Sequence, residues 1–171
     1  MTVLAAIAIS SVAAMTDIRS RRIPNWLTYS AMLLGVGLHT IANGAQGFFF
    51  STGGLFLGLA LLIVFYLAGG MGAGDIKLMG AVGALLGPKG VFIAFIFTAL
   101  VGGIYAIVLL LVRFRVTETV VRLSTMFSSL RSGTGLTSIS ADQTRKMPVL
   151  NYGVAIALGV FLSIIWNVYE K

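Results

Sequence analysis

The stretch Gly69–Gly80, with the sequence GGMGAGDIKLMG, lies between two long apolar runs. Its charged side chains, Asp75 and Lys77, stand where hydrocarbon would otherwise continue. Ionisable groups at membrane depth are costly and usually face a protein interior or a wet cavity. The glycines before Asp75 allow the backbone to bend and to approach another helix closely. The stretch therefore predicts a polar site inside an otherwise apolar protein.

The composition indicates an integral membrane protein. Of the 171 residues 58% are apolar, and the mean hydropathy of +1.00 exceeds that of ordinary soluble domains. Because the chain has no cysteine and one histidine, it excludes disulfides, a cysteine nucleophile and a histidine-rich metal cluster. We expect neither a metal nor a cofactor. The glycine run lacks the Gly-Lys-Ser/Thr of a phosphate loop, so nucleotide binding is not expected.

The apolar runs predict an all-α fold of six transmembrane helices in a single domain, residues 1–171. The expected spans are Met1–Met15 with a helical extension past Asp17, Trp26–Ala42, Phe48–Ala68, Asp75–Leu86, Val91–Val112 and Leu150–Val168. Asn43-Gly44 and Gly87–Gly90 predict turns. Pro24 disfavours helix at the residue before it, and Asn25 is a candidate N-cap of the second span.

The fourth span, of only about a dozen residues, decides the topology. If it crosses, both termini lie outside and most basic residues face the cytoplasm. These are Arg19, Arg21, Arg22, Lys77, Arg113, Arg115, Arg122, Arg131, Arg145 and Lys146, with Lys89 and Lys171 outside. A re-entrant segment would move the basic residues of the loop 113–147 outside. The net charge of +7 is thus better explained by the positive-inside rule than by nucleic-acid binding, and the rule favours crossing. Crossing places Asp17 and Asp75 on the same, cytoplasmic side.

The loop 113–147 differs in composition from the rest of the chain, being polar and rich in serine and threonine. Within it apolar residues recur at helical spacing: Val116, Val120, Leu123, Phe127 and Leu130. An amphipathic helix on the membrane surface and a disordered loop both fit this pattern. The sequence leaves the two open.

Asp17 and Asp75 together permit acid–base chemistry. Two carboxylates that share a site titrate as a unit, one holding a proton while the other is charged. Such a pair can deprotonate a water and protonate a carbonyl oxygen, which is peptide hydrolysis without a covalent intermediate.

Each polar residue also has a purely structural interpretation. Asp17 can pair with a neighbouring arginine, and Asp75 can cap the fourth helix. The Lys77 side chain can extend its amine to the membrane interface. His39 falls near the outer end of the second span, away from both aspartates, and we expect it to be structural.

At these residues the sequence resembles the type IV prepilin peptidases, the GxGD class of intramembrane aspartyl proteases, and above all their short Tad/Cpa-type form. Asp17–Asn25, DIRSRRIPN, resembles the first aspartate motif of that family. Gly72–Lys77, GAGDIK, matches its GxGDxK motif. Tyr152–Ala157, YGVAIA, is similar to the segment that opens its last span, although Pro148 here does not directly precede the tyrosine.

The resemblance implies a multi-pass protease of a prokaryotic cell membrane, with Asp17 and Asp75 as its catalytic pair. Its partners would be the bilayer and a Tad/Flp-type prepilin, whose N-terminal leader is cut at the cytoplasmic face. The site-shaping residues would be Pro24, Asn25, Gly72, Gly74 and Lys77. Longer relatives carry a cysteine-containing domain linked to methylation of the pilin. This chain has no cysteine, so we expect peptidase activity only.

Two other classes of function fit the same residues. A proton- or cation-coupled transporter would use the aspartates to carry charge, and its helices would break near mid-membrane. A non-catalytic assembly factor of a pilus or secretion machine would need neither aspartate.

Overall fold

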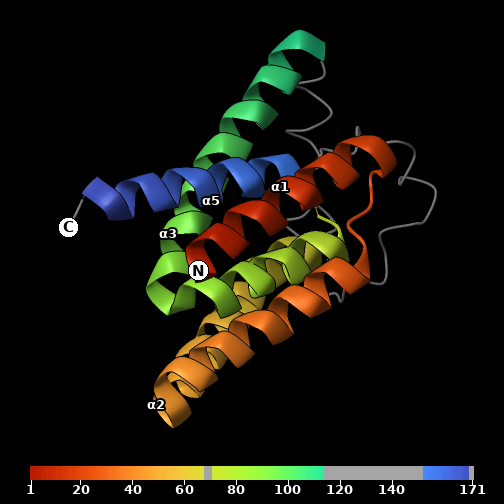
Figure 1. The fold of residues 1–171 in the computed structure, drawn as a ribbon. Coiled ribbons are helices and arrows are strands. Elements are labelled where there is room, and N and C mark those ends of the chain that lie inside the picture. Colours follow the sequence, from red (N-terminus) through yellow and green to blue (C-terminus); the bar gives the residue numbers. More distant parts are fainter. Residues whose placement is uncertain (68–70, 114–151, 170–171) are drawn as a thin grey trace, which may run out of the picture. The chain divides into compact units, whose positions relative to one another are not determined.

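The computed structural model describes residues 1–67, 71–113 and 152–169, and their secondary structure is helical throughout. The helices are α1 (Thr2–Ser20), α2 (Asn25–Leu67), α3 (Ala73–Arg113) and α5 (Tyr152–Tyr169), as Figure 1 shows. By length and composition α1, α2 and α3 can each cross a membrane, and α5 is apolar but shorter. The all-helical membrane fold is therefore confirmed. The predicted loop 113–147 lies, but for its first residue, outside the described residues.

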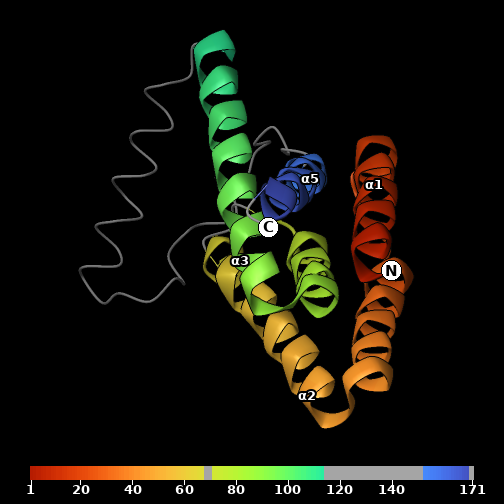
Figure 2. The same cartoon turned by 60° about the vertical axis from the view of Figure 1, so that its left-hand side comes forward.

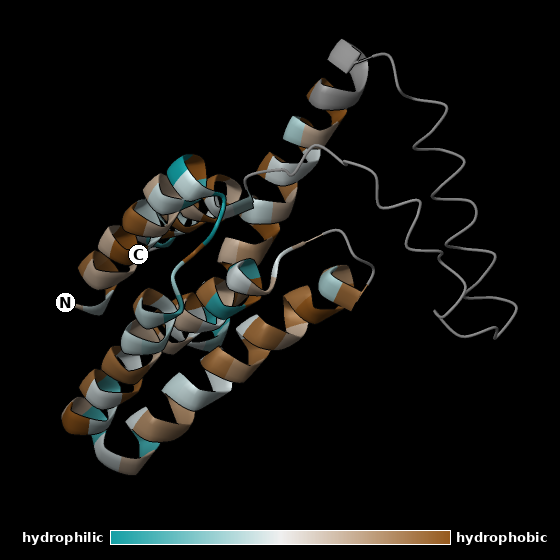
Figure 3. Cartoon of the chain, turned by 90° about the vertical axis from the view of Figure 1, so that its right-hand side faces the viewer, coloured by the Kyte–Doolittle hydropathy of each residue, from teal (hydrophilic) through white to brown (hydrophobic). Residues whose placement is uncertain are grey.

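The chain divides into two compact units, residues 1–102 with 151–171 and residues 103–150. All contacts given below lie within the first unit. Large apolar side chains are exposed on it, such as Leu33 and Phe49, which are 74% and 71% exposed. Figure 3 shows that hydrophobic residues occur along all of its helices. Such side chains suit contact with lipid.

The end of α1 and the start of α2 follow from local sequence. As predicted, α1 continues past Asp17. It ends where Arg21 adopts a left-handed conformation (φ 50°) and donates its N–H to the carbonyl of Asp17 at 2.8 Å. Pro24 separates the helices, and its carbonyl accepts the N–H of Leu27 at 3.2 Å. Helix α2 begins at Asn25, within one residue of the expected start.

The two long helices each break at a glycine. Helix α2 is interrupted at Gly44 (φ 59°, ψ −137°) and α3 at Gly87 (φ 75°, ψ −178°), both in conformations that favour glycine. Both turns were predicted from sequence and are confirmed. Figure 2 shows α2 turning back on itself at its break. Each long helix thus consists of two helical segments.

Side chains from α2 satisfy the backbone carbonyls that the break in α3 leaves without helical partners. Pro88 has no N–H to donate to the carbonyl of Ala84, and Ser51 Oγ donates to that carbonyl instead, at 2.6 Å. One residue on, Nε2 of His39 lies 3.0 Å from the carbonyl oxygen of Leu85, which it reaches as a donor. His39 therefore has a structural role, as expected.

Glycines set the packing of the second segment of α2 against the first segment of α3. A Cβ on Gly54 would collide with the backbone of Gly83, and one on Gly58 would lie 2.9 Å from the carbonyl carbon of Met79. Because the partner numbers fall as those in α2 rise, the two segments are antiparallel. Small residues allow such close approach of membrane helices.

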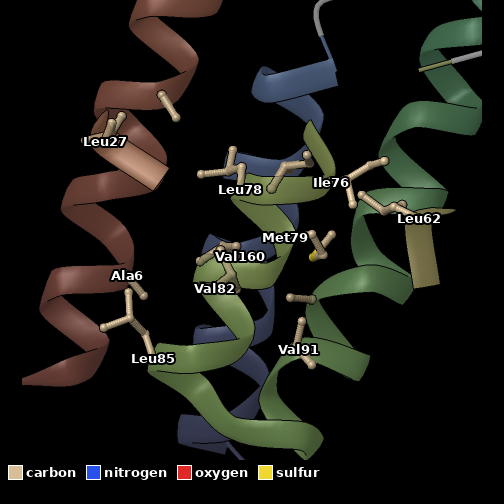
Figure 4. Packing of buried hydrophobic residues seen from close by; sticks show 13 residues of the cluster. Ala6, Leu27, Leu62, Ile76, Leu78, Met79, Val82, Leu85, Val91 and Val160 are labelled. Atoms are coloured by element: carbon tan, nitrogen blue, oxygen red, sulfur yellow. The ribbon is translucent and has the colours of Figure 1, made fainter. Parts of the chain in front are cut away.

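The first segment of α2 also packs against the first segment of α3, and these two run parallel. A Cβ on Gly35 would lie 2.8 Å from the backbone of Ala84, and one on Gly80 would lie 3.2 Å from the Met32 side chain. The segment 73–86 therefore lies among several helices. Its side chains at Leu78, Met79, Val82 and Leu85 are almost completely buried and fill the core in Figure 4.

Candidate active site

Asp17 is held by the first turn of α5. It lies in the last turns of α1, is 7% exposed, and its Oδ2 accepts the N–H of Gly153 at 3.0 Å. Arg19, Arg21 and Arg22 are exposed. The hydrogen bond that anchors this carboxylate therefore comes from the backbone of a distant helix, not from the neighbouring arginines.

Asp75 is held by the first turn of its own helix. It is the third residue of α3 and is 8% exposed. Its Oδ2 accepts the N–H of Gly72 at 3.2 Å, and its own N–H donates to the carbonyl of Gly72 at 3.1 Å. A carboxylate that reaches back to the residue before its helix is a capping arrangement. Asp75 therefore does cap the start of α3, and it does so with Oδ2 of its carboxylate.

The two carboxylates are both buried and interact electrostatically. Asp75 lies within electrostatic reach of Asp17, and Tyr152 lies within reach of Asp75. Asp17 lies at the C-terminal end of α1, and Asp75 and Tyr152 lie at the N-terminal ends of α3 and α5. A carboxylate beside a helix N-terminus is favoured there by the helix dipole. Two carboxylates so placed can share a proton and a water.

The other residues predicted for the site lie at the start of α3 and at the start of α2. A Cβ on Gly74 would lie 3.2 Å from Cβ of Ile23, so the start of α3 packs against the connection between α1 and α2. Lys77 donates to Oδ1 of Asn25 at 3.0 Å, and its amine lies 5.0 Å from the centre of the Tyr29 ring. Lys77 is thus tied to the start of α2, and the side-chain oxygen of Asn25 binds this amine instead of acting as an N-cap. Of the remaining two, Gly72 bonds Asp75 as described, and Pro24 ends the connection.

Gly153 is a site residue that sequence reasoning did not assign. Its segment, Tyr152–Ala157, was noted only for its resemblance to a family motif. The group that binds Asp17 is a backbone N–H, which every residue except proline carries. The signal in the sequence was therefore limited to the glycine itself, a residue that allows close approach of another helix.

Comparisons with known proteins identify a family for this chain. A model of the type IV leader peptidase family matches residues 4–107, which include both aspartates. Searches of curated proteins and of solved structures found no match. Since the match covers more than half of the 171 residues, the chain belongs to the type IV leader peptidase family.

Proposed function

We propose that this protein is an aspartic endopeptidase that removes the N-terminal leader of a Tad/Flp-type prepilin at the cytoplasmic face of the cell membrane. Asp17 and Asp75 are its catalytic residues. The observation that supports the proposal is that these carboxylates, far apart in sequence, are both buried at helix ends and interact electrostatically. Membership of a leader peptidase family supports the substrate class.

The geometry supports a reaction through a shared water. Oδ2 of each aspartate is held by a backbone N–H, so the carboxylates have fixed orientations. The ionised carboxylate takes a proton from the water, and the water oxygen attacks the peptide carbonyl carbon. The protonated carboxyl donates to the carbonyl oxygen, and the intermediate collapses as a proton passes to the leaving amine. We assign no pilin methylation to this chain.

We further propose that the six helical segments cross the membrane in alternate directions, as one domain with both termini outside. The antiparallel packing of the second segment of α2 on 73–86 supports this order. The segment Ala73–Leu86, at 1.5 Å per residue, is about 21 Å long, short of a hydrocarbon core of about 30 Å. A crossing by this segment would set Asp75 slightly below the inner surface, where a water-filled site can form.

A cleavage assay tests the chemistry. Purified protein in detergent is incubated with a Tad/Flp-type prepilin, and leader removal is followed by mass spectrometry. Asp17→Asn and Asp75→Asn should each abolish cleavage with unchanged melting temperature. Asp142→Asn makes the same chemical change at an aspartate to which the proposed mechanism gives no role, and it should leave cleavage intact. Cleavage by either site variant would reject the paired-acid mechanism, and cation uptake by proteoliposomes without cleavage would favour a transporter.

Labelling of single cysteines tests the topology, because the chain has no native thiol. Ser20 and Lys89 are both exposed and lie near opposite ends of the proposed spans. An impermeant maleimide added outside intact cells should label Lys89→Cys and spare Ser20→Cys. Equal labelling of the two would show that the segment 73–86 does not cross.

A further inference from the structure

The first turn of α5 approaches Asp17 unusually closely. Gly153, the second residue of α5, is buried and donates its N–H to Oδ2 of Asp17 at 3.0 Å. The first N–H groups of a helix have no partner within the helix, so this group is free to bind a carboxylate.

There is no room for a side chain at this position. A Cβ on Gly153 would lie 2.9 Å from Oδ2, 3.0 Å from Cβ and 3.1 Å from Cγ of Asp17. All three are tighter than ordinary van der Waals contacts. A methyl group here would therefore push the carboxylate away from the N–H that holds it.

We infer that Gly153 is a positioning residue, whose backbone N–H and missing side chain together fix the Asp17 carboxylate for hydrolysis. The inference rests on the proposed function, because it concerns how one proposed catalytic group is aimed. Oδ2 of Asp17 is anchored to α5, which fixes the plane in which the other carboxylate oxygen lies. A contact that only aims the carboxylate should leave substrate binding unchanged.

The expected signature is a loss of turnover without a loss of substrate binding. Gly153→Ala should lower kcat for prepilin cleavage by about 10- to 100-fold, the effect of displacing a reacting group by up to an ångström, and leave KM within about twofold. Gly102→Ala is the matched control. Its methyl would meet Ala155 and Tyr152 of the same α5 turn at an ordinary 3.9 Å, so its kcat should equal that of the wild type.

A cross-link tests the geometry without using catalysis. In the cysteine-free chain, Asp17→Cys combined with Gly153→Cys should form a disulfide on addition of an oxidant, since a Cβ at Gly153 would lie 3.0 Å from Cβ of Asp17. Disulfides need Cβ atoms about 3.5–4.5 Å apart, so only a small opening is required. Met15→Cys with Gly153→Cys is the control pair, because Met15 is 71% exposed, and it should not cross-link.

The outcomes separate this inference from the proposed function. Loss of kcat in Gly153→Ala at unchanged KM and melting temperature, together with the cross-link, would support it. Wild-type kcat in Gly153→Ala, or no cross-link, would overturn the inference while an inactive Asp17→Asn still upheld the proposed function. A raised KM at unchanged kcat would also overturn it. Cleavage by Asp17→Asn would reject the proposed function and the positioning role with it.

Discussion

Gly54→Ala and Gly53→Ala form a matched pair that tests how α3 is held against α2. A methyl at position 54 would overlap the carbonyl oxygen of Gly83 and lie 2.8 Å from the carbonyl carbon of Gly87. A methyl at position 53 would touch only the edge of the Pro88 ring, with Cγ at 3.8 Å. Because the atoms facing position 54 are backbone, they cannot rotate away. The helices must part, so we expect Gly54→Ala alone to destabilise the fold.

The comparison isolates the cost of the collision. Both changes replace a helical glycine by alanine, which gains up to about 1 kcal/mol in helix propensity, and this gain cancels between them. The remaining difference is the cost of overpacking, about 1–3 kcal/mol. At about 2–4 °C per kcal/mol for a chain of this size, Gly54→Ala should melt about 2–12 °C below Gly53→Ala.

The measurement is thermal unfolding of the purified variants in one detergent, followed by circular dichroism. Cleavage should also be slower in Gly54→Ala, because the displaced segment 73–86 carries Asp75 near its start. Equal melting temperatures for the two variants would refute the close backbone contact between α2 and α3.

Two hydrogen bonds and one backbone conformation give three further predictions. Ser51→Ala should lower the free energy of unfolding by about 1–3 kcal/mol, because it leaves a buried carbonyl without a donor. Thr52→Ala, whose hydroxyl bonds within its own helix, should change the free energy of unfolding by less than about 0.5 kcal/mol. Equal effects of the two substitutions would contradict a stabilising role of the bond from Ser51 to Ala84. Gly44→Ala should lower the free energy of unfolding by about 1–3 kcal/mol, because alanine is strained at a φ of 59°. A collision would not contribute, since a Cβ at this position has no neighbouring atom within 4 Å among the described residues. An unchanged melting temperature would contradict this strain. Lys77→Met and Asn25→Ala should show coupling of about 0.5 kcal/mol or more in a double-mutant cycle, whereas additive effects would show that their hydrogen bond contributes nothing.

Features that depend on local sequence could be predicted. The turns at Gly44 and Gly87 follow from glycine and proline within apolar runs, and α1 continues past Asp17 because no helix-breaking residue intervenes until Pro24. Counting spans and assigning the basic residues to one side puts Asp17 and Asp75 on the same side of the membrane, and this placement stays a prediction. These inferences need only residue types, their order and the thickness of a bilayer.

Features that depend on backbone partners could not be predicted. The N–H that binds Asp17 belongs to Gly153, and the acceptors of Ser51 and His39 are carbonyls exposed by a break in another helix. Backbone groups are the same at every position, so the sequence does not show which of them become available. The bond between Lys77 and Asn25 likewise joins side chains 52 positions apart, and either residue alone suggests a more local role.

The two carboxylates owe their positions to different contacts. Asp75 belongs to the segment 73–86, which packs closely against both segments of α2 at glycines. Asp17 lies on α1 and is fixed by a single backbone group of α5. A disturbance of the α2–α3 interface therefore reaches Asp75 first, and a disturbance at the start of α5 reaches Asp17 first. The proposed hydrolysis requires both carboxylates at one water, so we expect either displacement to slow it. Glycines far apart in the sequence should therefore affect one and the same reaction.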